Sequence, residues 1–160
     1  MTQPQASVIT DEMRAAIGQE SDPVTFEVDK NSCRMFARAV GYSDPVYYDE
    51  AAARSAGYRS IPAPPGFLGH PVIVPGQPNP LATAYFRFDT ALKRRLNGGT
   101  DVEYLEDVYA GDVLTATAKL VDISERQASI GLMLITVTQF TYRNQAGQVV
   151  AKVRATGISY

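Results

Sequence analysis

The chain has 160 residues, fifteen basic and seventeen acidic side chains and a formal net charge of −2, a length that fits one domain. Charges of both signs are mixed along the sequence, which argues against a nucleic-acid partner. One cysteine, Cys33, excludes an internal disulfide, and no apolar run approaches the roughly 20 residues that span a bilayer. We therefore expect one domain over residues 1–160, in the reducing cytoplasm and without membrane contact.

The N-terminal third predicts three short helices and one short strand. Apolar residues at spacings of three and four indicate the helices, capping residues mark their ends, and alternation with period two marks the strand. The expected elements are a loose arm over residues 1–9, a helix from the N-cap Thr10 to Gly18, a strand Val24–Val28, a helix capped by Asn31 or Ser32 and ended by Gly41, and a helix Glu50–Ala56 capped by Asp49.

The rest of the chain divides into a segment rich in proline and glycine, a helical stretch and a region of predicted strands. Ile61–Pro80 holds seven prolines and three glycines, so it allows at most a helical turn over Gly66–Gly69, and Phe86–Leu96 is the better helical stretch. Four long β-branched runs follow, typical of an antiparallel meander. These runs are Thr100–Val108, Val113–Ile123, Ala128–Tyr142 and Gln148–Ile158. The pattern predicts an α+β domain with helices first and a curved sheet after them.

Several blocks, in this order, resemble one family. Gly41–Asp49, read GYSDPVYYD, and Pro62–Gly66, read PAPPG, resemble the signatures G-D-x-N-P-x-H-x-D and P-I-x-H-G of the MaoC-like (R)-specific enoyl-thioester hydratases and dehydratases. Leu96–Thr100 and Tyr109–Leu114 resemble two further blocks of its N-terminal-type members. The resemblance implies a single hot-dog fold, an antiparallel sheet wrapped around a central helix. It also implies an acyl-CoA or acyl-carrier-protein thioester as ligand, a role in fatty acid metabolism, and no cofactor.

The positions that carry the family's chemistry are changed in this chain. Tyr42 stands where the family has its catalytic Asp, Tyr47 stands at the catalytic His, and Asp44 replaces an Asn. Hydration of an enoyl thioester needs an acid and a base that titrate near the working pH, whereas an unperturbed tyrosine titrates near ~10. Tyr42, Asp44 and Tyr47 are therefore weak catalytic candidates. The simpler interpretation is that the two tyrosines are ordinary side chains near a cleft and that Asp44 forms a turn.

The resemblance keeps the residues that would hold a thioester. Gly66 stands at the family's oxyanion glycine, while Pro65 replaces the neighbouring His. A Gly66 N–H at the start of a helix would stabilise a developing enolate oxygen. We therefore expect Pro65, Gly66 and Phe67 to bind substrate.

The remaining polar candidates have ordinary explanations. The cluster Lys93, Arg94 and Arg95 fits a solvated helix end, or a weak contact for the phosphates of CoA. His70 is the one histidine, so a His-based metal cluster is excluded and we expect no metal site. Cys33 lies on the apolar face of its predicted helix, where a buried, unreactive thiol is expected.

Three functions fit these observations. The leading hypothesis is an acyl-thioester-binding, non-catalytic subunit of a heteromeric (R)-specific enoyl-CoA hydratase or 3-hydroxyacyl-thioester dehydratase, whose partner hot-dog subunit supplies the Asp and His. The second is a self-sufficient homodimeric lyase or isomerase that uses the Tyr and Asp side chains. The third is a non-enzymatic module for acyl binding or assembly.

Overall fold

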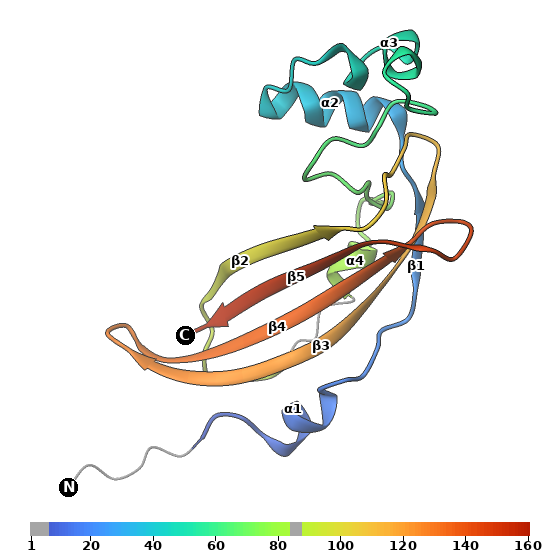
Figure 1. Ribbon diagram of the computed structural model, residues 1–160. Helices are drawn as coiled ribbons and strands as arrows, with labels where there is room; N and C mark the ends of the chain where they lie inside the picture. The colour runs from blue at the N-terminus through green and yellow to red at the C-terminus, as the bar shows by residue number, and fades with distance from the viewer. Residues whose placement is uncertain (1–6, 84–87) are drawn as a thin grey trace, which may run out of the picture.

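The computed structural model describes residues 7–83 and 88–160 as a long antiparallel sheet with short helices (Figure 1). Four strands follow the helical region, and one short strand precedes the second helix. The elements are α1 (Asp11–Ala16), β1 (Val24–Glu27), α2 (Lys30–Val40), the 3₁₀ turn η1 (Pro45–Tyr47), α3 (Glu50–Ser55), α4 (Pro80–Thr83), β2 (Arg95–Tyr104), β3 (Val113–Ala128), β4 (Gly131–Arg143) and β5 (Val149–Ser159).

The five strands form one sheet in the order β1-β3-β4-β5-β2, and every pair is antiparallel. β1 and β2 are therefore the two edges. β2 bulges between Asn97 and Gly99, and a Cβ on Gly98 would lie only 2.9 Å from the Thr156 side chain. Gly98 is required there because the bulge brings its backbone close to β5.

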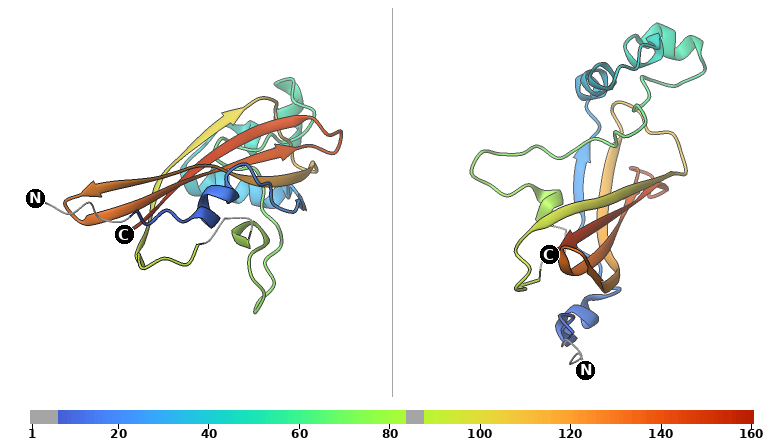
Figure 2. Two further views of the ribbon diagram at one scale, coloured as in Figure 1. Left: turned by 90° about the horizontal axis from the view of Figure 1, so that it is seen from below. Right: turned by 90° about the vertical axis from the view of Figure 1, so that its left-hand side faces the viewer.

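Helices α1, α2 and α3 lie at the two ends of this sheet. Figures 1 and 2 show α2 and α3 beyond one end, and α1 near the other end. Cys33 and Ala37 on α2 are fully buried, and Cys33 joins the main core with Val28, Ile61 and Leu114. A smaller cluster under α1 contains Met13, Ile123 and Leu134. The arrangement confirms the α+β class, with helices first and a long antiparallel sheet after them.

Alternating burial explains why β3 forms where it does. Leu114, Ala116, Ala118 and Leu120 are buried, while the residues between them are only half-buried. This period of two places every second side chain in the core, as in any strand with one covered face. By contrast, all ten residues of β2 are exposed.

Several predicted boundaries were wrong. The helix expected over Phe86–Leu96 is absent from its described part, since residues 88–94 are irregular and β2 begins at Arg95. Pairing with β5 therefore outweighs the local helical pattern. β2 ends at Tyr104, four residues before the predicted strand end at Val108. β3 continues to Ala128, five residues beyond the predicted strand end at Ile123.

The helix caps were predicted in part. Thr10 caps α1 and Asp49 caps α3, as expected. The N-cap of α2 is Asp29 rather than Asn31 or Ser32, because the Asp29 carboxylate accepts a hydrogen bond from the Ser32 N–H at 2.7 Å.

The arm expected to be loose lies partly outside the described residues, which begin at residue 7. Within its described part, the Ser7 hydroxyl and the Val8 N–H both donate to Glu125 at 3.0 Å. Residues 7 and 8 are thus held on β3 rather than loose. In the described ranges, no helix is long and apolar enough to cross a membrane.

Candidate functional site

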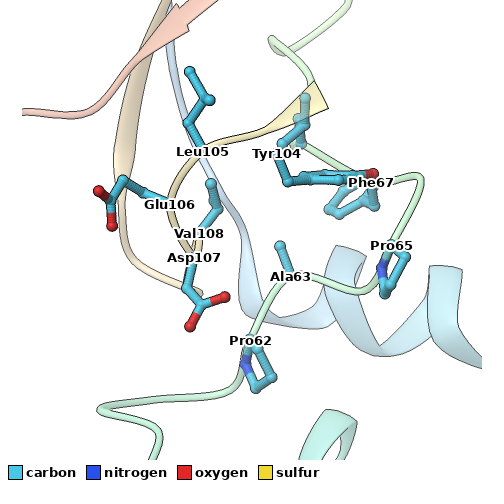
Figure 3. Close-up of a pocket in the computed structure, with 10 residues that line it drawn as sticks. Pro62, Ala63, Pro65, Phe67, Tyr104, Leu105, Glu106, Asp107 and Val108 are labelled. Carbon is cyan, nitrogen blue, oxygen red and sulfur yellow. The ribbon is translucent and has the colours of Figure 1, made fainter. Parts of the chain in front are cut away.

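A cavity of about 400 Å³ lies between two segments that run side by side, residues 62–68 and residues 104–108 (Figure 3). Backbone hydrogen bonds hold these segments together: the Ala63 N–H donates to Val108 O at 2.7 Å, and the Ala110 N–H donates to Ile61 O at 2.9 Å. This volume falls in the range of small-molecule binding pockets. The Pro-rich segment is therefore one wall of a cavity, rather than a free loop.

A tight turn carries the predicted substrate-binding residues into this wall. The Phe67 N–H donates to Pro64 O at 2.9 Å, so Pro65 and Gly66 are the two central residues. Gly66 has a φ of 92°, a conformation that glycine adopts without strain, and proline followed by glycine is the pattern of a type II turn. The helical start expected at Gly66 was wrong, because the two prolines and the positive φ favour this turn instead.

The Gly66 N–H already has an acceptor within the chain. It donates a hydrogen bond to the hydroxyl oxygen of Tyr104 at 2.6 Å. Tyr104 is the last residue of β2, with 46% of its surface exposed, and its side chain lines the cavity. The N–H expected to face a thioester oxygen is thus occupied by a phenol.

Acidic side chains stand at the opposite wall of the cavity. Glu106 and Asp107 both line it, and Figure 3 shows their carboxylates on the side away from Pro65. Asp107 accepts a hydrogen bond from the Tyr109 hydroxyl at 3.1 Å. Sequence reasoning missed Tyr104, Glu106 and Asp107 because it placed them inside a regular strand. Their polar spacing just before the Ala110-Gly111 turn was the available signal.

The structure brings the three weak catalytic candidates together, but away from this cavity. The Tyr42 and Tyr47 rings lie 5.7 Å apart, and Asp44 caps η1 by accepting from the Val46 N–H at 3.0 Å. Burial, followed by the nearby Tyr58 and Asp44, raises the pKa of Tyr47 above its ordinary value. A raised pKa makes the phenolate scarcer near neutral pH, which suits a base poorly.

None of these three residues is among the described residues that line the 400 Å³ cavity. The chain therefore presents a cavity with a Gly66 turn, and a separate tyrosine pair.

The basic cluster is also distant from the cavity. Lys93 pairs with Asp89 at 3.1 Å, and both side chains are exposed. Arg94 exchanges backbone hydrogen bonds with Tyr160 at 3.0 Å, and Arg95 begins β2. Nine steps of roughly 3.3 Å along β2 place Arg95 on the order of 30 Å from Tyr104. Within one chain, the cluster is not brought to the proposed acyl site.

The buried carboxylate of Asp112 holds together the parts of the chain next to the two segments that form the cavity. Asp112, 2% exposed, accepts hydrogen bonds from the Arg59 guanidinium, from the Tyr109 N–H at 2.8 Å and from Gln145 at 3.1 Å. Burial alone raises the pKa of Asp112, but the hydrogen bonds from Arg59, Tyr109 and Gln145 outweigh it and lower the pKa. Arg59 also stacks 4.2 Å from the centre of the Tyr109 ring. This cluster joins the segment before Ile61 to the segment after Val108.

His70 packs against an aromatic ring, and Cys33 is buried as its position on the apolar helix face predicts. The His70 ring packs edge-on against Phe67 at 6.1 Å, and its Nδ1 lies 3.2 Å from Pro71 O. Cys33 is fully buried, and burial raises the pKa of its thiol to about 11. A thiol with that pKa is a poor nucleophile near neutral pH.

The family model described as "FAS1-like, dehydratase domain region" matches residues 15–153. A UPF0336 protein of Parafrankia sp. is 31% identical over 130 residues, which cover 81% of each chain. A probable enoyl-CoA hydratase alpha subunit of Thermomonospora curvata is 30% identical over 76% of this chain, but only 41% of its own length. The chain therefore spans less than half of that longer relative.

Solved structures agree with the sequence comparison. The C-terminally truncated HadBC (3R-hydroxyacyl-ACP dehydratase) complex of Mycobacterium tuberculosis superposes with a TM-score of 0.71 at 25% identity, over 94% of this chain and 98% of the other. The fold and the cavity define an α+β hot-dog domain. With the family match over residues 15–153, the chain belongs to the FAS1-like dehydratase domain family of MaoC-like hot-dog proteins.

Proposed function

We propose that this chain is the acyl-thioester-binding, non-catalytic subunit of a heteromeric (R)-specific enoyl-CoA hydratase or 3-hydroxyacyl-thioester dehydratase, acting in cytoplasmic fatty acid metabolism. The observation that carries the proposal is the separation of the 400 Å³ cavity from Tyr42 and Tyr47. Pro65, Gly66 and Phe67 form the turn beside that cavity and hold the acyl group. The Asp and His for hydration come from a partner hot-dog subunit.

The exposed edge of the sheet supports a partner. All ten residues of β2 are exposed, including the apolar Leu96 and Val102. An open edge strand with apolar side chains is a ready surface for pairing with another chain. The HadBC neighbour is itself a complex, which supports a second subunit.

The proposal is tested by assaying the chain alone and with a partner that has the D-x-N-P-x-H signature. Alone, the protein should bind butyryl-CoA weakly and show no hydration of crotonyl-CoA. Mixed with the partner, it should raise hydration above that of the partner alone. Appreciable turnover by the pure chain would contradict the proposal.

The carboxylates at the cavity favour a second candidate, a self-sufficient homodimeric lyase or isomerase. Glu106 and Asp107 line the cavity and could move a proton there, which Tyr42 and Tyr47 could not do from their position. Turnover by the pure chain that is lost in Asp107→Asn would favour this candidate. Ligand binding without turnover, in every assembly tested, would favour a non-enzymatic acyl-binding module.

A further inference from the structure

A second and larger cavity lies behind the proposed acyl site. Its volume is about 630 Å³, and it lies between β1, the start of α2 and the Pro-rich segment. The apolar part of its lining is Val24, Phe26, Phe67, Pro71, Val72 and Pro80. None of the functions assigned above uses this space.

One side chain belongs to both cavities. Phe67 lines the 400 Å³ cavity together with Tyr104, and it lines the 630 Å³ cavity together with His70. Among the described lining residues, no other position is shared by the two. The Phe67 side chain therefore stands between the two spaces.

The Phe67 ring is held in place from several directions. Its centre lies 5.3 Å from that of Phe36 and 6.1 Å from that of His70, and the residue is 9% exposed. Its backbone is fixed by the hydrogen bond to Pro64 O. A buried ring packed against two others on a closed turn is a fixed wall, rather than a side chain that swings aside.

The polar groups of the second cavity do not prevent it from taking an alkyl chain. The carboxylate of Asp29 is already engaged by the N–H and hydroxyl of Ser32, at 2.7 Å and 2.8 Å. His70 Nδ1 lies 3.2 Å from Pro71 O. Thr25 is paired with Thr115 at 3.0 Å, and the exposed Glu27 is the remaining charged residue of the lining. Phe26 and its apolar neighbours are then the surface that a hydrocarbon would cover.

We propose that Phe67 ends the acyl-binding cavity and so sets the length of acyl chain that this protein accepts. The inference rests on the proposed acyl-binding function and extends it. Short acyl groups fill the first cavity, and longer ones meet the ring. Removing the ring joins the first cavity to the second, and the distal methylenes of a long chain then enter the space between β1 and the Pro-rich segment.

The test is a calorimetric titration of the whole chain with butyryl-, octanoyl-, dodecanoyl- and palmitoyl-CoA. Wild-type affinity should fall between the shorter and the longer chains. Phe67→Ala should raise the affinity for dodecanoyl-CoA relative to that for butyryl-CoA about tenfold or more, because butyryl-CoA loses its contact with the ring and gains no new space that it can fill. Because loss of a buried ring can unfold a protein, Phe67→Leu is measured in parallel, with the same direction and a smaller gain expected.

Two neighbours supply matched controls. Leu68 lines the first cavity but not the second, and Val72 lines the second but not the first. Leu68→Ala widens the first cavity without joining it to the second, so it should shift the chain length at which affinity falls less than Phe67→Ala does, and Val72→Ala should not shift it.

The results that would contradict the chain-length inference differ from those that would contradict the acyl-binding function. If wild-type protein binds all four ligands equally, or if both Phe67 variants keep the wild-type profile, the chain-length inference is wrong while the acyl-binding function stands. If the wild-type protein binds none of the four, both proposals are overturned.

Discussion

The hydroxyl oxygen of Tyr104 lies 2.6 Å from the backbone nitrogen of Gly66 and accepts its hydrogen bond. The two residues are far apart in sequence, one ending an edge strand and the other in the middle of a turn. The pair closes one side of the cavity. It also means that a ligand carbonyl competes with the protein's own phenol for the Gly66 N–H.

Replacing Tyr104 with Phe should strengthen acyl-thioester binding. The substitution removes the competing oxygen and leaves most of the ring, so the Gly66 N–H becomes available to the ligand. A hydrogen bond of about 1 kcal/mol corresponds to a Kd lowered roughly threefold to tenfold, measured by titration with butyryl-CoA. Tyr109→Phe is the control, because the Tyr109 hydroxyl donates to Asp107 instead. Weaker binding in Tyr104→Phe would show that the phenol itself contacts the ligand.

Replacing Tyr47 with Phe should leave the activity of the assembled hydratase nearly unchanged. The substitution removes a hydroxyl whose pKa is raised by burial, and the residue is not among those lining the cavity. We expect kcat/KM for crotonyl-CoA, with the partner present, to stay within about twofold. A loss of more than about tenfold would place Tyr47 in the mechanism and favour the self-sufficient lyase.

Replacing Asp112 with Asn should destabilise the fold and reduce its sensitivity to acid. Loss of the charge beside Arg59 should lower the free energy of unfolding at neutral pH by about 2 kcal/mol. This loss is smaller than for a fully buried ion pair, because Arg59 is largely exposed. The pKa of Asp112 is lowered in the fold, so its stabilisation is complete above the unfolded pKa and is lost as pH falls through the folded value, below 3.8. Urea unfolding from about pH 6 to about pH 2.5 measures both effects.

The control for this prediction is Asp101→Asn on the exposed strand β2, which should change stability by less than about 0.5 kcal/mol. An Asp112→Asn protein with wild-type stability and an unchanged acid slope would show that the Arg59 contact contributes nothing to the fold.

The Cys33 thiol should be almost unreactive in the folded protein. Burial raises its pKa to about 11, with a further contribution from Asp29. The thiolate fraction near pH 8 is therefore about a hundredfold below that of a free cysteine, and access is blocked as well. Labelling with a disulfide reagent should therefore be at least about a hundredfold slower in buffer than in urea. Equal rates in both conditions would mean that the helix α2 opens readily.

Replacing Val102 with Lys should weaken assembly with the catalytic partner. A lysine in the middle of an exposed edge strand opposes pairing with another chain, and Val102 is already exposed, so stability should change by less than about 0.5 kcal/mol. Analytical ultracentrifugation of the mixture measures the loss. Glu103→Lys places the same side chain one position along β2, on the opposite face of the sheet. If Val102→Lys leaves the complex intact, β2 is not the interface.

The sequence predicts the strands of this fold better than the site. β3 and β5 follow from their β-branched runs, and the caps Thr10 and Asp49 follow from local chemistry. The helix expected near Phe86–Leu96 failed because pairing between β2 and β5 joins residues far apart in the chain, which local periodicity cannot report.

The sequence predicts residues on one wall of the cavity only. The Pro65-Gly66-Phe67 wall was expected from the resemblance, and the structure places these residues beside the cavity. The facing wall was missed, since Tyr104 reaches Gly66 only after β2 has joined the sheet. Asp112 was likewise part of a recognised block, but its partner Arg59 comes from a distant segment.

The turn at Pro64–Phe67 has a thermodynamic consequence. Two consecutive prolines fix two backbone φ angles before folding, and the Asp112 cluster ties the segment before the turn to the segment after Val108. The residues that face the ligand therefore have little conformational freedom left to lose when it arrives. Binding at this corner is expected to carry a small entropic penalty for ordering the protein, so that a modest number of contacts suffices for useful affinity.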